Sequence, residues 1–140
     1  MKRLWRGKRK GKEKGQSLVE VALALPVLIL ILAGALDLGR LYYVTVALTD
    51  AAGEGATYAA INPHDTAEIV SRAQAASGGL VQIEPGNVAI DCPVVAAGMP
   101  VTVTVSYDFT IATPLVNMIV PDGVMTLQGI AAESILTGGM

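Results

Sequence analysis

The longest feature of the hydrophobic pattern is an uninterrupted apolar run near the N-terminus. Val21–Leu36 contains sixteen residues without a charge, and Glu20 and Asp37 border it. With its apolar neighbours, the run reaches the roughly 17–25 residues that a membrane-spanning helix needs. We therefore expect a transmembrane segment over about residues 21–38. Pro26 lies inside it and predicts a kink, because proline removes a backbone donor and crowds the preceding turn.

The helical pattern continues beyond this segment. Apolar and small residues recur at steps of three and four, and no proline occurs between Pro26 and Pro63. We expect one long helix over residues 16–60, with Ala47 among the residues that lie off its apolar stripe. The stripe is expected to pack on a sheet, on neighbouring chains, or on both. Its predicted members are Leu38, Leu41, Tyr42, Thr45, Leu48, Thr49, Ala52, Ala56 and Ala59.

The remaining residues, 61–140, have the pattern of a small α+β domain. A short helix is expected between a break at Asn62-Pro63 and a stop at Gly78-Gly79, and the clearest strand alternates apolar and polar residues between two prolines. Together with the long N-terminal helix, these elements predict an α+β fold whose small antiparallel sheet is covered by the outer half of that helix. The expected elements are a helix at His64–Ser77, weak strands at Val81–Ile83 and Val88–Ile90, and long strands at Val101–Ile111 and Val124–Ile135, the last two separated by the apolar connector Pro114–Val120 and a Pro121-Asp122-Gly123 turn.

Charge is divided sharply along the chain. Residues 1–15 carry eight Lys/Arg and one Glu, a net charge of +7, whereas residues 16–140 carry two Lys/Arg and eleven Asp/Glu, a net charge of −9. A basic segment before an apolar helix stays in the cytoplasm, so residues 61–140 are expected outside it. No aromatic stacking set accompanies the basic residues, so nucleic-acid binding is not expected. Asp37 and Arg40 are spaced to form an ion pair at the outer interface, or are simply two interfacial charges.

Two ways of processing the N-terminus fit the pattern. An ordinary secretory signal would be cut after Ala35 in the small-residue site Ala33-Gly34-Ala35, which would release a soluble protein. A leader of the prepilin type would instead be cut between Gly15 and Gln16, which keeps the apolar helix in the product. A carboxylate such as Glu20 is costly at the start of an apolar helix unless it finds a partner, for example the new N-terminal ammonium of a neighbouring subunit. The second interpretation accounts for Glu20, and the first does not.

The segment Gly15–Ala60 resembles the N-terminal signature of the TadE-like family, the pseudopilins of tight-adherence (Flp-type, type IVb-like) pilus systems. The resemblance covers 46 of the 140 residues, and Val21 and Gly53 depart from it, since an aromatic and a basic residue are more usual there. It implies a pilin-like fold, cleavage by a prepilin peptidase at Gly15/Gln16 and an assembly role for Glu20. The matching motifs are Gly15–Glu20 (GQSLVE), the Ala/Leu run into Pro26, Asp37–Arg40 (DLGR), Ala47–Ala52 (ALTDAA) and Glu54–Ala60 (EGATYAA).

The resemblance also implies a role and a location. It implies a minor, single-pass subunit of the inner (cytoplasmic) membrane that helps to assemble an adhesive pilus, with a cytoplasmic N-terminus. The implied partners are the prepilin peptidase, other pilins or pseudopilins, assembly-platform proteins and membrane lipid. The alternatives are a small exported or membrane-tethered binding domain with an ordinary signal, and a pseudopilin of a type II secretion system.

Residues that could carry catalysis are scarce. The chain has one His and one Cys, and it contains no HExxH, CxxC, GxSxG, Walker or Rossmann pattern. His64 and Asp65 stand at a helix start, where capping or solvation is expected. Cys92 has no partner in the chain, so it is expected to be a buried small residue or to form an intermolecular disulfide. Asp108 and Asp122 lack a cation-binding loop pattern. We expect no enzymatic activity, cofactor, metal or small-molecule substrate.

Overall fold

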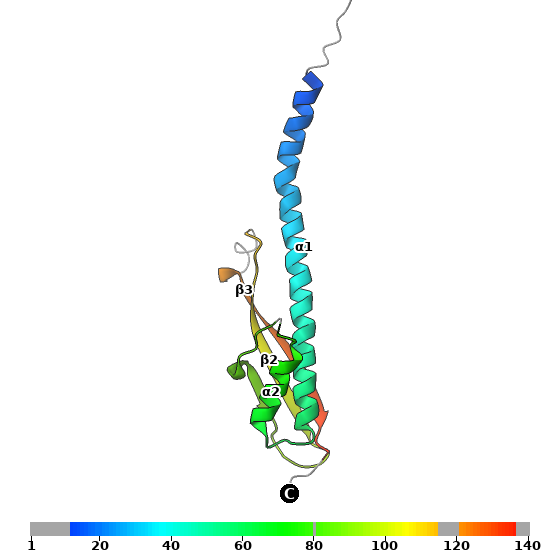
Figure 1. Ribbon diagram of the computed structural model, residues 1–140, viewed down its shortest axis with the longest axis vertical. Coiled ribbons are helices and arrows are strands. Elements are labelled where there is room, and N and C mark those ends of the chain that lie inside the picture. The colour runs from blue at the N-terminus through cyan, green and yellow to red at the C-terminus, as the bar shows by residue number, and fades with distance from the viewer. Residues whose placement is uncertain (1–11, 80, 115–120, 137–140) are drawn as a thin grey trace, which may run out of the picture. The chain divides into compact units, whose positions relative to one another are not determined.

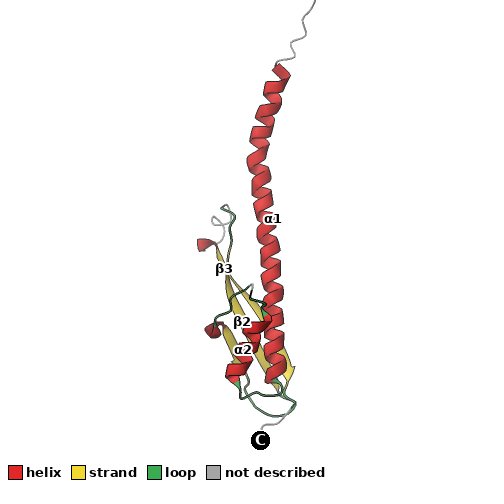
Figure 2. Cartoon of the chain, viewed as in Figure 1, coloured by secondary structure: helices red, strands yellow, loops and turns green. Residues whose placement is uncertain are grey.

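The computed structural model describes residues 12–79, 81–114 and 121–136. Helix α1 (Lys12–Ala59) is followed by helix α2 (Thr66–Ala76) and by three strands, β1 (Val88–Asp91), β2 (Pro100–Thr110) and β3 (Val124–Ser134), as Figures 1 and 2 show. A long apolar helix followed by a small antiparallel sheet is the α+β arrangement that the pattern predicted. Most of the predicted basic leader and most of the apolar connector lie outside the described residues.

The chain divides into two compact units, the first ending at Leu36 and the second beginning at Asp37. The sequence pattern separated a helix at 16–60 from a domain at 61–140. In the structure, the unit that contains the sheet also takes in the outer part of α1. The reason is that the residues of α1 beyond Asp37 provide one wall of its core.

In the first unit, the described residues are helical throughout, and the helix continues on both sides of Pro26. Its large apolar side chains are exposed apart from that of Leu30, which is half-buried. Since Val21–Leu36 contains no charged residue, this part of the helix has no polar face to turn toward water. Among the described residues, α1 is the helix that is long and apolar enough to cross a membrane, with a mean hydropathy of 2.6 over its best window. The exposed apolar side chains are Leu18, Val19, Val21, Leu23, Leu25, Val27, Leu28, Ile29, Ile31, Leu32 and Leu36.

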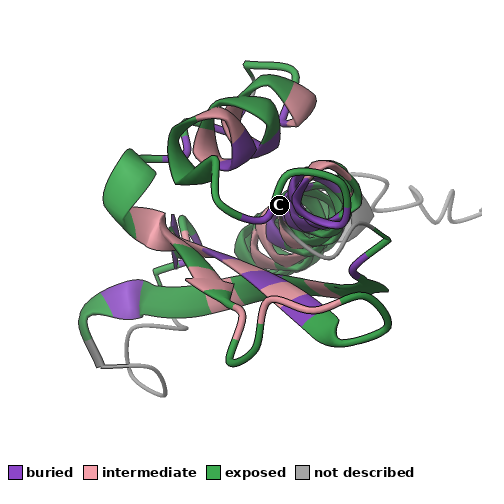
Figure 3. Ribbon diagram, turned by 90° about the horizontal axis from the view of Figure 1, so that it is seen from below, coloured by how far each residue is buried: buried purple, intermediate pink, exposed green. Residues whose placement is uncertain are grey.

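In the second unit, the sheet has the order β1-β2-β3, and both pairings are antiparallel. Val105 in the central strand pairs with Val88 on one side and with Gly129 on the other. Figure 3 shows α2 and the α1 helix on the same face of the sheet. The alternation in β2 turns Val101, Val103, Val105 and Phe109 into the core beneath the helices, as predicted, and its threonines to the other face.

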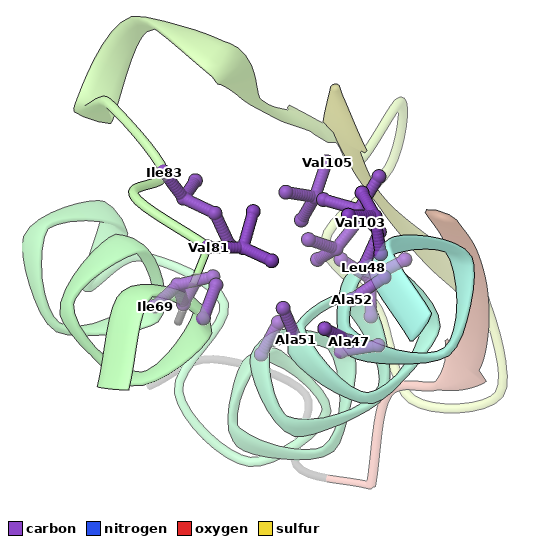
Figure 4. Packing of buried hydrophobic residues seen from close by; sticks show 14 of the residues in the cluster. Ala47, Leu48, Ala51, Ala52, Ile69, Val81, Ile83, Val103 and Val105 are labelled. Atoms are coloured by element: carbon purple, nitrogen blue, oxygen red, sulfur yellow. The ribbon is translucent and has the colours of Figure 1, made fainter. Parts of the chain in front are cut away.

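The predicted stripe on the outer half of α1 is partly wrong. Leu38 and Tyr42 are 69% and 72% exposed, whereas Ala47, which was expected off the stripe, is buried. The helix contacts the sheet on one side and α2 on the other, so two adjacent rows of small residues are buried rather than one mixed row. Figure 4 shows these small side chains converging with those of α2 and β2. The buried residues of this part of α1 are Asp37, Val44, Ala47, Leu48, Ala51, Ala52, Gly55, Ala56 and Ala59.

Glycine permits two close approaches across this core. A Cβ at Gly55 would lie 3.2 Å from Cγ1 of Val103 and 3.5 Å from Cβ of Ala73. A Cβ at Gly129 would overlap the backbone carbonyl of Leu48. The backbone of β3 therefore touches the backbone of α1, which only glycine allows.

Helix α2 lies within the predicted range. Its N-cap is Asp65, whose Oδ1 accepts a hydrogen bond of 3.2 Å from the Glu68 amide. It ends before Gly78 and Gly79, which both have positive φ. The local signals for this helix were sufficient because capping and stopping depend on neighbouring residues alone.

The predicted strand at Val81–Ile83 is wrong. This segment is irregular, although Val81 and Ile83 are both buried in the core. Their carbonyls are satisfied by side chains instead of by a strand, since Ser77 Oγ donates to Val81 O at 2.9 Å and Gln74 Nε2 donates to Ile83 O at 2.7 Å. The apolar pattern therefore indicated burial correctly, but the secondary structure that it suggested did not form.

Candidate functional site

The predicted processing and assembly residues lie on the first turns of α1. Gly15 and Gln16 are both exposed, and a Cβ at Gly15 would meet no atom within 4 Å. Gln16 Nε2 donates a hydrogen bond of 3.1 Å to Glu20 Oε1, four residues further along the helix. Gln16 and Glu20, four residues apart, therefore share one face of the helix, and Gly15 lies on the turn that precedes them.

Glu20 is exposed at the start of the apolar segment. Between described side chains the ion pairs are Arg40–Asp37 and Arg72–Glu68, so neither involves Glu20. A carboxylate beside apolar side chains requires water, a cation or hydrogen-bond donors. The hydrogen bond from Gln16 occupies one of the two oxygens of Glu20.

Asp37 is the most fully engaged polar side chain at the start of the second unit. It is 8% exposed. Its Oδ2 accepts hydrogen bonds from the Thr113 amide at 2.8 Å, from Thr113 Oγ1 at 2.6 Å and from the Ala112 amide at 3.1 Å. These donors lie just after β2, 75 or more residues away in sequence, so this clamp holds the end of β2 against α1. Sequence reasoning missed it because no local spacing relates Asp37 to Thr113.

Arg40 is the predicted partner of Asp37, and the two side chains do lie together. Arg40 Nη1 is 3.5 Å from Asp37 Oδ1, a longer contact than those that Ala112 and Thr113 make. The Arg40 guanidinium carbon lies 5.2 Å from the centre of the Phe109 ring, within the range of a cation–π contact. The Arg40 side chain is nevertheless 59% exposed. Phe109 is a further contact that sequence reasoning did not identify.

A second cluster joins the end of α1 to α2. Tyr58 Oη donates to Asp65 Oδ2 at 3.3 Å, and the Arg72 guanidinium carbon lies 4.4 Å from the centre of the Tyr58 ring. Arg72 Nε is 3.2 Å from Glu68 Oε1. Partial burial raises the pKa of the Tyr58 hydroxyl, and the neighbouring Asp65 carboxylate acts in the same direction. These contacts orient α2 and engage Arg72, the cation of the cluster.

No catalytic constellation forms among the residues that the structure describes. In that part of the chain no three His, Cys, Asp or Glu residues are close enough to hold a metal ion. Cys92 is half-buried, and its Sγ lies 3.8 Å from the Val94 carbonyl oxygen. A groove of about 670 Å³ runs between α1 and α2, and its lining contains no histidine, cysteine or serine: Asp50, Gly53, Glu54, Arg72, Ala75 and Ala76.

Comparison with known proteins gives one match. The model of the family described as TadE-like protein matches residues 15–57. No curated protein and no solved structure matches the chain. The matched range contains Gly15, Gln16, Glu20, Asp37 and Arg40. The match confirms the TadE-like segment that the sequence motifs indicated.

Proposed function

We propose that this chain is a membrane-anchored minor pilin or pseudopilin that acts in the assembly of a tight-adherence (Flp, type IVb-like) pilus. In this role a prepilin peptidase removes residues 1–15, and the apolar helix remains in the product. The protein sits in the cytoplasmic membrane with its N-terminus in the cytoplasm. Its partners are other pilins or pseudopilins and the proteins of the assembly platform, and it performs no enzymatic reaction.

The observation that carries this proposal is the match of residues 15–57 to TadE-like proteins. The matched segment is one continuous helix, whose apolar side chains are exposed up to Leu36. Such a helix requires lipid or other helices around it. Glu20 supports the assembly role, because its exposed carboxylate accepts only the Gln16 amide among the described side chains.

The mature N-terminus tests the proposal. Intact mass and N-terminal sequencing of protein extracted from membranes should show a start at Gln16. Gly15→Ala should leave the leader attached, because the peptidase must approach the backbone there closely. Gly53→Ala is the matched control, since both glycines lie in α1 with open space at the Cβ position, and it should be processed normally. Normal cleavage of the Gly15→Ala chain at the same bond would contradict the assignment.

Glu20 is tested separately from cleavage. Glu20→Ala should be processed but should reduce the amount of assembled pilus, whereas Glu20→Asp should retain part of the activity because it keeps the charge. Processing is read from the mass and assembly from sheared pili. If Glu20→Ala chains assembled like the wild type, the proposed charge partner would be wrong.

A second candidate is an exported binding domain with an ordinary signal, and one observation favours it. The compact second unit begins at Asp37, one residue after the Leu36 start that cleavage following Ala35 would leave. An N-terminal signal sequence also meets the length and hydropathy criteria that α1 meets. A soluble product that starts at Leu36 would establish this candidate and remove the first.

A further inference from the structure

We propose that Arg40 binds the phosphate of a membrane lipid headgroup and so fixes the depth at which α1 leaves the bilayer. The inference rests on the proposed function, because it requires the apolar part of α1 to lie in a membrane. It adds a ligand and a binding residue that the assembly role does not include.

Arg40 lies shortly after the end of the apolar run in the sequence. It follows Leu36, the last residue of the apolar run, by four residues, which is about 6 Å along a helix. The headgroup region extends roughly 5–8 Å beyond the hydrocarbon core on each side. Helical side chains lean toward the N-terminus, and the Arg40 guanidinium accordingly lies 3.5 Å from Asp37, the first residue of the second unit.

Arg40 makes only a long ion-pair contact with Asp37. The Asp37 carboxylate is already held by Ala112 and Thr113 at 2.6–3.1 Å, while Arg40 stands 3.5 Å away. The Phe109 ring, 5.2 Å from the guanidinium carbon, holds the cation in place without blocking its outer donors. A planar guanidinium held in this way, with its side chain 59% exposed, suits the geometry of a phosphate group.

Arg40 is one of few cationic residues beyond the leader, and two tyrosines lie close to it in the sequence. Residues 16–140 contain only two Lys/Arg, namely Arg40 and Arg72. Arg72 is engaged by Glu68 and Tyr58. Tyr42 and Tyr43 follow Arg40 by two and three residues and are exposed on α1. Tyrosine is enriched at membrane interfaces, where its ring and hydroxyl face different media. Beyond the leader, an otherwise acidic chain thus places the more exposed of its two arginines, 59% against 49% for the side chain, near interfacial aromatic residues.

The test measures the contact itself. The full chain is produced with Arg3, Arg6 and Arg9 changed to Lys, which keeps the charge of the leader and leaves Arg40 and Arg72 as its only arginines. Arg72→Gln in this background leaves Arg40 alone, and Arg40→Gln leaves Arg72 alone as the matched control. Both chains are labelled with ¹³C at the guanidinium carbon of arginine. They are reconstituted into vesicles of phosphatidylethanolamine and phosphatidylglycerol in a buffer without phosphate.

Solid-state NMR then records dephasing of the guanidinium ¹³C signal by ³¹P. A direct guanidinium–phosphate hydrogen bond places the two nuclei about 4 Å apart, so the Arg40 chain should dephase strongly and the Arg72 chain should not. Lipid is the only source of phosphorus in the sample. No dephasing of the Arg40 chain, or equal dephasing of both chains, would overturn the inference.

Flotation of the same samples separates this inference from the proposed function. Chains that float with the vesicles and resist carbonate extraction are anchored in the bilayer. If the chains are anchored but show no dephasing, the contact of Arg40 with lipid phosphate is refuted and the membrane anchor is not. Chains that do not float would refute the membrane anchor, and the role of Arg40 with it.

Discussion

Replacement of Gly129 by alanine should disrupt the second unit more than any other single added methyl group discussed above. Gly129 lies in β3, where it pairs with Val105. A Cβ there would overlap the carbonyl of Leu48 and would lie 2.6 Å from the Thr49 amide nitrogen. All these atoms belong to the backbone of α1, so no change of rotamer can relieve the contact. Either α1 or β3 must move, and the core between them must open.

The magnitude follows from a comparison of three glycines. Overpacking a core costs about 1–3 kcal/mol, and a contact against backbone belongs at the upper end of this range. At Gly55 the nearest atom is Cγ1 of Val103, a side-chain atom at 3.2 Å that can yield, so we expect a loss of about 1 kcal/mol. At Gly53 a Cβ meets no atom within 4 Å, and alanine should stabilise the helix by about 1 kcal/mol.

The assay is thermal unfolding of the full chain in detergent micelles, together with amide hydrogen exchange of the β2 segment. For a unit of this size, 1 kcal/mol corresponds to about 4–8 °C in Tm. Gly129→Ala should therefore lower Tm by about 12–24 °C and speed exchange in β2, while Gly53→Ala should raise Tm by several degrees. A Gly129→Ala chain as stable as the Gly53→Ala chain would refute the close approach of β3 to α1.

Two further substitutions test the polar clamps. Asp37→Asn should cost about 2 kcal/mol, because it removes the charge from the hydrogen bonds with Ala112 and Thr113. Amide exchange at Thr113 should accelerate roughly 30-fold, and equal exchange in the Asp37→Asn and wild-type chains would contradict the clamp. Asp65→Asn should keep the cap of α2, since Asn caps as well as Asp, but should lower the pKa of Tyr58 toward its ordinary value. A ¹³C NMR titration of the Tyr58 ring measures this change, and an unaltered pKa would exclude the influence of Asp65.

The elements that sequence predicted well are those whose signals are local. The alternation over Val101–Ile111 corresponds to β2 at Pro100–Thr110, and the alternate apolar residues do form the floor of the core. The cap at Asp65 and the glycine stop at Gly78 bound α2. In each case the secondary structure is determined by a residue and its near neighbours in the sequence.

The parts that sequence could not predict depend on partners far along the chain. Val81 and Ile83 have an apolar spacing that suits a strand. Their carbonyl oxygens instead accept hydrogen bonds from the side chains of Ser77 and Gln74. Which residues of α1 are buried depends on where β3 and α2 pack against it. The apolar pattern of the helix alone does not give those positions. Of the candidate site, the proximity of Gln16 and Glu20 follows from helical periodicity, whereas the hydrogen bonds of Asp37 could be seen only in the structure.

The step from Leu36 to Asp37 is where the physical character of the chain changes. Before it, exposed apolar side chains require an apolar surrounding. A carboxylate placed next in the chain, beside apolar side chains, would be costly unless it were hydrogen-bonded. Ala112 and Thr113 supply the donors from within the second unit, so the Asp37 carboxylate is hydrogen-bonded without solvent. Because these shorter bonds satisfy Asp37, Arg40 makes only a contact of 3.5 Å with it, and the 59% exposed Arg40 side chain can also reach a lipid phosphate.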